Sequence, residues 1–187
     1  MEKVNWINNL SEAERKARTD KKLLFLFFHR QNCGGCAKTI EETLTHSEVI
    51  EAIESNCVPM KMEVTEDQNM VAKYKIEWTP TFIVADENGI ELERWVGYLP
   101  AEDFISQLCL SEGLGLFHTE RYHDAEGMFE TLLRENENSE MAPEAKYFHG
   151  VSCFKEKGDV NYLKDTSKYM KEHYPNSTWT KRASAWI

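Results

Sequence analysis

The pattern of apolar and polar positions predicts a first part that contains strands and helices. Residues 23–28 form a continuous apolar run, which is typical of a strand covered on both faces. The alternation over residues 58–64, the apolar run over 81–85 and the segment 90–96 after the turn predict three further strands. The turn sequence at 86–89 joins the last two strands as a hairpin. We expect the first two strands to be parallel and linked by helix.

Apolar residues at helical spacing predict the helices. After about residue 110 no strand pattern remains, and short helices joined by short turns favour stacked helical hairpins. We therefore expect two domains, residues 1–110 and 111–187. Ser11 is an alternative cap for a shorter first helix. The predicted helices cover residues 5–18, 36–44, 47–55, 67–75 and a segment from Pro100 in the first part, and 111–121, 124–136, 142–156, 159–173 and 178–186 in the second.

The segment Cys33-Gly34-Gly35-Cys36 directly follows the first strand and leads into a helix. A helix N-terminus offers unpaired N–H groups and a partial positive charge, and both favour a thiolate over a thiol. The first cysteine of such a motif titrates at about 3.5–7.5 instead of about 8.5. The second lies one helical turn away and can close a disulfide. Cys33 and Cys36 are therefore the predicted catalytic residues.

Two cysteines at this spacing can also form half of a zinc site, which requires a second pair of ligands. Cys57, Cys109 and Cys153 are scattered singly, and the sequence has no second C-x-x-C and no H-x3-H. Redox chemistry is the preferred interpretation, and we expect no metal and no organic cofactor. Metal or cluster binding between two chains that each contribute Cys33 and Cys36 is an alternative. Cys57 and Cys109 are expected to be buried and unreactive.

Charge and hydropathy narrow the range of partners. The 187-residue chain has 22 basic and 32 acidic residues and a formal charge of −10. An acidic chain without a basic patch argues against nucleic acid and anionic membranes as partners.

No apolar stretch approaches the roughly 20 residues that span a bilayer. Residues 1–6 lack the charged and apolar regions of a signal peptide, so we expect a cytoplasmic protein. In a reducing compartment a C-x-x-C is more often catalytic than structural.

Over residues 5–110 the sequence resembles the thioredoxin family. The matching features are the 23–28 strand, the Cys33–Cys36 motif, Thr79-Pro80-Thr81, the hairpin turn and Val96-Gly97. The resemblance implies an α/β thioredoxin fold, with a mixed central sheet flanked by helices. It also implies a cis proline that faces the two cysteines.

The cis proline implied by the resemblance is Pro80, and Thr79 before it would offer backbone hydrogen bonds to a bound substrate. An ordinary trans proline that opens a strand is the alternative. Trp78 is expected to line the substrate groove, and a plain core or surface tryptophan is the alternative for this position.

The sequence departs from the thioredoxin pattern at three places. Two glycines occupy the inside of the motif where thioredoxin has a proline, so thioredoxin's reduction potential is not carried over. The family's buried acid aligns with Phe27, and the lysine that pairs with this acid aligns with Lys61. The family's tryptophan upstream of the motif is His29 here. A charged His29 can lower a cysteine pKa or donate a proton, and a partly exposed histidine at a strand end is the alternative.

Residues 111–187 resemble tetratricopeptide repeats. Small residues let paired helices approach, and aromatic residues fill the gap between them. The resemblance implies an all-α domain of helical hairpins with a concave surface for a partner or client protein. An ordinary helical extension is the alternative. The residues that carry the resemblance are Gly113, Leu116, Tyr122, Ala125 and Phe129 in the first hairpin, and Ala145, Tyr147, Gly150 and Phe154 in the second.

Taken together, these features predict a thiol–disulfide oxidoreductase that works as a protein disulfide reductase. Its partners are then disulfide-containing protein substrates and an external reductant. The alternative is a redox-linked chaperone or adaptor, in which protein binding by the helical repeats is the main role. The intact C-x-x-C favours turnover, while the glycine pair and the missing acid favour a changed role.

Overall fold

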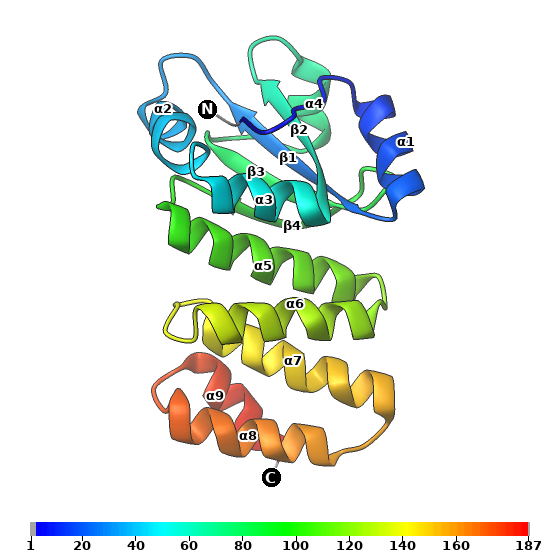
Figure 1. The fold of residues 1–187 in the computed structure, drawn as a ribbon, viewed down its shortest axis with the longest axis vertical. Coiled ribbons are helices and arrows are strands. Elements are labelled where there is room, and N and C mark those ends of the chain that lie inside the picture. The colour runs from blue at the N-terminus through cyan, green and yellow to red at the C-terminus, as the bar shows by residue number, and fades with distance from the viewer. Residues whose placement is uncertain (1–2, 187) are drawn as a thin grey trace. The chain divides into compact units, whose positions relative to one another are not determined.

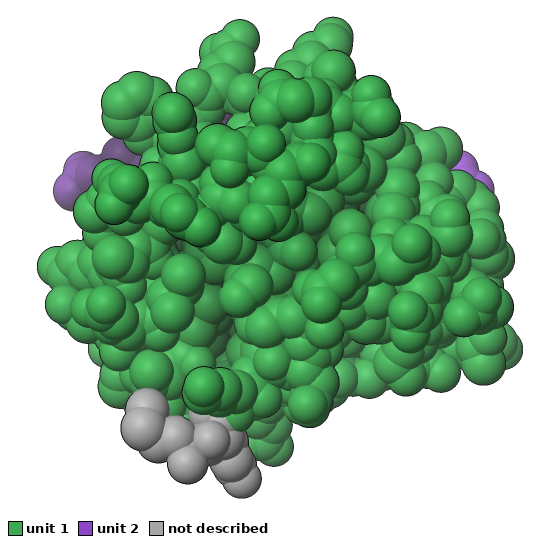
Figure 2. All heavy atoms as spheres, turned by 90° about the horizontal axis from the view of Figure 1, so that it is seen from above, with its two compact units in different colours: residues 1–108 green, residues 109–187 purple. Residues whose placement is uncertain are grey.

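The computed structural model describes residues 3–186. Met1 and Glu2, the first two residues of the segment that lacks the features of a signal peptide, lie outside the described residues. The chain forms two compact units, residues 1–108 and 109–187, which Figure 2 colours separately. Within the described part of the chain, no helix is long and apolar enough to cross a membrane.

A four-stranded mixed sheet forms the centre of the first unit (Figure 1). The strands are β1 (Leu23–His29), β2 (Cys57–Glu63), β3 (Thr81–Ala85) and β4 (Glu91–Val96), in the order β2-β1-β3-β4. Strand β1 pairs with β2 in parallel and with β3 antiparallel, and β3 and β4 form an antiparallel hairpin. The predicted parallel pair and the predicted hairpin are therefore confirmed.

Helices cover both faces of this sheet, which explains why β1 is apolar from Leu23 to Phe28. On one face, Leu24, Leu26 and Phe28 pack into a cluster with residues of α1 (Leu10–Asp20) and α4 (Gln68–Lys73). The opposite face carries an aromatic stack. Full burial of one such side chain is favourable by about 1.5–3 kcal/mol. The rings of the stack include Phe25, Phe27, Phe82, Trp95 and Phe104.

The first helix is shorter than the predicted range 5–18, because the chain before Leu10 is extended. The backbone N–H of Ile7 donates to the carbonyl of Pro59, and Ile7 forms a parallel bridge with Met60 at the edge of β2. The side chain of Asn9 then accepts the N–H of Glu12 and caps α1. The cap is thus Asn9, and the alternative cap at Ser11 is wrong.

Two further helices connect β1 to β2. Helix α2 (Gly34–Lys38) continues into a π-helical turn over Thr39–Thr43, which together correspond to the predicted 36–44 helix. Helix α3 (Ser47–Asn56) corresponds to the predicted 47–55 helix. In Figure 1, α3 leads directly into β2.

Helix α5 (Ala101–His118) runs through the predicted break near residue 110, so the separate helix predicted over 111–121 is wrong. Leu108, Cys109 and Leu110 are all buried, and no proline or capping residue interrupts the helix there. The point after which no strand pattern remains therefore lies inside one helix. The chain leaves the helical conformation at Glu120, whose φ is 61°.

The described part of the second unit consists of helices joined by turns and contains no strand, as predicted. Two glycines allow neighbouring helices to approach closely. A Cβ atom on Gly113 would lie 2.4 Å from a ring carbon of Phe129, and one on Gly150 would lie 2.2 Å from the hydroxyl of Thr166. The helices after α5 are α6 (Tyr122–Glu135), α7 (Ala142–Lys157), α8 (Asn161–His173) and α9 (Thr178–Ala183), followed by a 3-10 turn over Ser184–Trp186.

Candidate active site

Cys33 is the N-cap of α2, at the point where the chain leaves the loop after β1. Its backbone is extended (φ −99°, ψ 113°), and its sulfur accepts the backbone N–H of Cys36 at 3.2 Å. Cys33 is partly exposed, whereas Cys36 is 1% exposed. One sulfur is therefore accessible to a substrate, and the other is held inside the protein.

Thr79 reaches the same sulfur from the loop before β3. The Cys33 thiol donates to the Thr79 carbonyl at 3.4 Å, and the Thr79 hydroxyl donates to the Cys33 sulfur at 3.5 Å. The Thr79–Pro80 peptide bond is cis, which is the geometry that the family resemblance implies. The structure thus brings Cys33 and Thr79, both singled out in the sequence, into direct contact.

The surroundings of the two thiols shift their pKa values in opposite directions. Burial raises the pKa of Cys33, but hydrogen bonds from the Cys36 thiol, the Thr79 hydroxyl and nearby backbone N–H groups outweigh burial and lower it overall. Burial and the hydrogen bond with Cys33 raise the pKa of Cys36 above its ordinary value. Since the thiolate is the nucleophile, Cys33 is the more reactive of the pair.

A cleft of about 1080 Å³ opens beside the Cys33 sulfur. Trp78 lines it and is 72% exposed, so the core alternative for this tryptophan is excluded. An exposed aromatic side chain beside a reactive sulfur is a suitable surface for an extended peptide. The residues around the cleft include Arg30, Cys33, Thr65, Gln68, Trp78, Thr79, Pro80 and Tyr98.

The inside of the motif is also close to Pro80. A Cβ atom on Gly35 would lie 3.1 Å from the ring of Pro80, whereas a Cβ on Gly34 would meet nothing within 4 Å. The glycine at 35 therefore fits a tight approach between the motif and Pro80. No close contact requires a glycine at position 34.

His29 lies at the end of β1, where its ring contacts Glu63 and Phe27. Its Nδ1 is 3.4 Å from a carboxylate oxygen of Glu63, and its ring packs on Phe27. Burial lowers the pKa of His29, although Glu63 opposes this shift. The described residues that line the cleft do not include His29.

Glu63 is a buried acid that the sequence analysis missed. One of its carboxylate oxygens accepts the N–H and the hydroxyl of Thr65, at 3.3 and 3.1 Å. Strand β2 places Glu63 opposite His29 in the parallel ladder. Glu63 is buried because side chains on both faces of β2 are covered. The sequence signal that could have revealed this pair is a histidine and a glutamate at the ends of two strands predicted to be parallel.

Phe27 and Lys61 occupy the positions where the family resemblance implies an acid and its lysine. Phe27 is fully buried and stacks on Phe82, with ring centroids 4.9 Å apart. Lys61 is its partner in the β1–β2 ladder, and its ammonium lies 6.0 Å from the ring centroid of Trp6. An aromatic core thus replaces the expected charge pair.

The other three cysteines are buried and form no disulfide. Burial raises the pKa of Cys109 to about 12. This agrees with the prediction that Cys57 and Cys109 are buried, and a thiol with such a pKa is a poor nucleophile at neutral pH.

Comparison with known proteins supports the fold of the first unit, and the matched residues include the candidate site. A family model described as a thioredoxin-like domain matches residues 10–109. A thioredoxin from Thermus thermophilus is 23% identical with a TM-score of 0.51, over 57% of this chain and 85% of that one. A DsbH oxidoreductase is 20% identical with a TM-score of 0.52, and the match covers 59% of this chain and 85% of that one. At these identities the likeness is one of fold. The comparison with curated proteins gave no match.

Proposed function

The chain belongs to the family of thioredoxin-like domains, and from this premise we propose that it is a thiol–disulfide oxidoreductase whose redox pair is Cys33 and Cys36. One observation carries the proposal. The partly exposed Cys33 sulfur receives hydrogen bonds from the N–H of Cys36 and the hydroxyl of Thr79 beside an open cleft. Such donors stabilise a thiolate, which is the attacking species in disulfide exchange.

The first step is attack on a substrate disulfide. The Cys33 thiolate bonds to one substrate sulfur, the substrate disulfide breaks, and the other substrate sulfur leaves as a thiolate. The product is a mixed disulfide between Cys33 and the substrate. Thr79 and Pro80 lie beside the reacting sulfur, and we assign them to holding the substrate chain, with Trp78 as an apolar surface next to it.

In the second step Cys36 attacks the Cys33 sulfur. A Cys33–Cys36 disulfide forms, the mixed disulfide breaks, and the substrate leaves with two thiols and two electrons. Burial raises the Cys36 pKa, while the N–H of Arg30 and the Thr79 hydroxyl favour its thiolate. Because Phe27 provides no carboxylate, the Cys36 proton passes to the departing substrate thiolate, directly or through water. An external thiol reductant then restores both cysteines, and no organic cofactor takes part.

The reduction potential of the pair tests the direction of electron flow. We propose a protein disulfide reductase of a reducing compartment such as the cytoplasm, and this requires a potential near −270 mV in equilibration with dithiothreitol or glutathione. A value of about −180 to −120 mV would instead identify an oxidant or isomerase. Absence of a reversible two-electron couple would reject the redox pair itself.

Single-cysteine variants test the roles of the two sulfurs. Cys33→Ser should abolish reduction of a protein disulfide, and Cys36→Ser should accumulate the mixed disulfide with substrate. Cys57→Ser is the control, because this buried cysteine lies outside the cleft lining. Full turnover by the Cys33→Ser variant would exclude the mechanism.

A redox-linked chaperone or adaptor is the second candidate. It is favoured by Phe27, which leaves the second cysteine without an acid, and by the helical hairpins of residues 109–187, which suit protein binding. Suppression of client aggregation by the Cys33→Ser/Cys36→Ser double variant separates the two functions. Full suppression supports the chaperone, and its loss supports thiol chemistry.

A further inference from the structure

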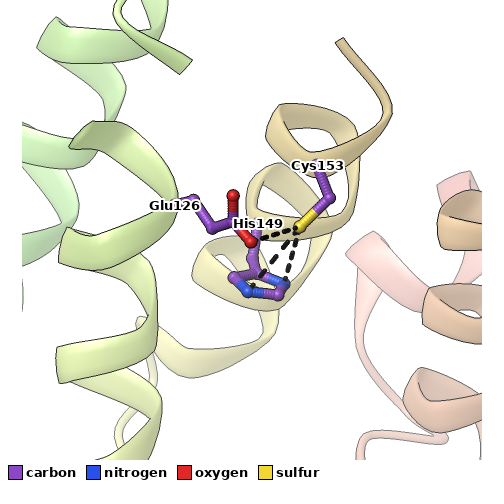
Figure 3. Close-up of side chains that lie close together, drawn as sticks. All are labelled: Glu126, His149 and Cys153. Carbon is purple, nitrogen blue, oxygen red and sulfur yellow. Dashed lines mark hydrogen bonds between the residues drawn. The ribbon is translucent and has the colours of Figure 1, made fainter. Parts of the chain in front are cut away.

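A second cluster of chemically active side chains lies in the helical unit, apart from the proposed redox function. His149 and Cys153 are four residues apart on α7, and Glu126 and Glu130 are four residues apart on α6. Side chains at this spacing share one face of a helix. Helices α6 and α7 pack against each other, and the two pairs meet in the contact between them. Figure 3 shows three of these side chains, Glu126, His149 and Cys153.

The three central groups are close enough to share one ion. The Cys153 sulfur lies 3.2 Å from a carboxylate oxygen of Glu126 and 3.9 Å from each ring nitrogen of His149. Ligand atoms of all three residues lie within 4.8 Å of one another. In Figure 3 the carboxylate and the sulfur come from opposite helices and lie beside the imidazole.

The two separations from the Cys153 sulfur bracket those of a tetrahedral zinc site, and the Glu126 and His149 ligand atoms lie within 4.8 Å of each other. With bonds of about 2.3 Å to sulfur and about 2.0–2.2 Å to nitrogen and oxygen, neighbouring ligand atoms lie about 3.6 Å apart. The observed distances of 3.2 and 3.9 Å fall on either side of this value. Thiolate, imidazole and carboxylate together suit zinc better than the hard cations magnesium and calcium.

The outer contacts of the cluster also fit a metal. The His149 Nε2 atom lies 3.3 Å from Glu130, so Nε2–H donates to this carboxylate and Nδ1 keeps its lone pair. A ligating histidine commonly donates its other N–H to a carboxylate. The second oxygen of Glu126 is buried, and it has no hydrogen-bond partner among the described residues.

We propose that Cys153, His149 and Glu126 bind a zinc-type divalent cation, with Glu130 orienting the imidazole. When the metal–sulfur bond forms, the thiol proton passes to solvent. Three protein ligands leave a fourth position for water. The ion would connect α6 to α7 and stabilise the helical unit.

The alternative use of this cluster, a cysteine nucleophile activated by histidine, does not fit the burial. Cys153 is 1% exposed, so a substrate of any size is kept from its sulfur, whereas a single ion needs little space. Two lysines of α7 also face the cluster. The Lys157 ammonium lies 2.8 Å from Glu126, and Lys146 acts electrostatically on Cys153 and Glu130.

Lys157 makes the proposal sharply testable, because its ammonium and the metal compete for the same carboxylate. The Lys157 side chain is 40% exposed and can move into solvent when the ion enters. Lys157→Met should therefore tighten metal binding by about two- to fivefold, the worth of an exposed ion pair. Lys155→Met is the matched control, since it removes the same charge from an exposed position on the same helix.

The experiment titrates Co²⁺ into the full chain carrying Cys33→Ser and Cys36→Ser, which removes the other thiolate pair. We expect one Co²⁺ per chain, a thiolate-to-cobalt charge-transfer band, displacement by Zn²⁺, and a Zn²⁺-dependent rise in melting temperature. Adding Cys153→Ser should abolish the band. Adding His149→Ala, Glu126→Gln or Glu130→Gln should weaken binding by about tenfold or more.

Cys109→Ala, which removes another buried cysteine, should leave the band unchanged, and circular dichroism checks that each variant is folded. The proposal is overturned if the folded background protein shows no saturable one-to-one binding. A band that survives in Cys153→Ser also overturns it, as does Lys157→Met binding no tighter than Lys155→Met.

Discussion

The Thr79 hydroxyl is one of two side-chain donors to the Cys33 sulfur, beside the Cys36 thiol, and it can be removed without touching the redox pair. It donates to the Cys33 sulfur at 3.5 Å and lowers the pKa of that thiol. Thr79→Val removes the donor, so less thiolate is present at neutral pH. Alkylation of Cys33 by iodoacetamide at pH 7 should slow by roughly two- to fivefold, the equivalent of a hydrogen bond of about 0.5–1 kcal/mol.

The sign of the pH dependence follows from the lowered pKa. The Cys33 alkylation rate should rise with pH and level off below the ordinary cysteine range, and the Thr79→Val curve should lie at higher pH. Both curves converge where the thiol is fully ionised. Thr79→Ser keeps the hydroxyl and should behave like the unmodified chain. An unshifted Thr79→Val curve would show that the Cys36 thiol and the backbone donors set the Cys33 pKa without Thr79.

Trp78 provides a second prediction for a single side chain. Because it is 72% exposed, Trp78→Ala should change the free energy of unfolding by less than about 0.5 kcal/mol. Its loss should raise KM for a protein disulfide severalfold and leave reduction of a small disulfide nearly unchanged. Ile90→Ala, at an exposed position outside the cleft lining, is the control. Equal effects on both substrates would remove Trp78 from substrate binding.

At the scale of elements, the two glycines at the start of α2 should respond differently to the same change. Gly34→Ala meets nothing within 4 Å and should stabilise the protein by about 0.4–1 kcal/mol, since it restricts the unfolded chain. Gly35→Ala presses on Pro80 at 3.1 Å and should slow disulfide reduction. Urea unfolding and turnover of the two variants provide the comparison. If Gly35→Ala is as active as Gly34→Ala, the contact with Pro80 has no catalytic importance.

Close helix packing in the second unit predicts another contrast. Gly113→Ala would force a methyl group into the ring of Phe129 and should destabilise the protein by about 1–3 kcal/mol. Gly127 lies on α6 with open space around it, so Gly127→Ala should stabilise by about 0.5–1 kcal/mol. Thermal unfolding of both variants shows whether each substitution raises or lowers the stability of the protein. A stabilising Gly113→Ala would mean that Phe129 moves aside without cost.

Strands were predicted more precisely than helix ends, for a physical reason. The buried run of β1 and the turn before β4 depend on local residue types. The start of α1 depends instead on Ile7, which hydrogen-bonds to Pro59 of a distant segment. The continuity of α5 likewise depends on the burial of Leu108 and Leu110 by tertiary packing. Contacts between segments far apart in sequence leave no mark in a local pattern.

At the scale of the whole molecule, the acidic charge predicts solution behaviour. The chain carries a formal charge of −10 at pH 7, and its isoelectric point is near 5.1. A protein associates most readily when its net charge is small. Solubility in polyethylene glycol should therefore be lowest near pH 5 and increase toward pH 7. A minimum well away from pH 5 would indicate that a local patch controls association.

The candidate site was predictable where its residues are close in sequence, and less so where helices or strands bring them together. The motif followed from the sequence and the cis geometry of Pro80 from the family resemblance, whereas the hydrogen bonds between Cys33 and Thr79 were not predicted. Glu63 required the register of β1 against β2. The cluster of Glu126, His149 and Cys153 was also missed, because each spacing of four residues is unremarkable until α6 and α7 face each other.

The contact between Gly113 and Phe129 has an evolutionary consequence. Position 113 can carry no side chain as long as position 129 holds a phenylalanine ring in its present place. A smaller residue at 129 would make room for alanine at 113. In related chains that share this pair of helices, the two positions should therefore change together, and an alignment should show them as a covarying pair.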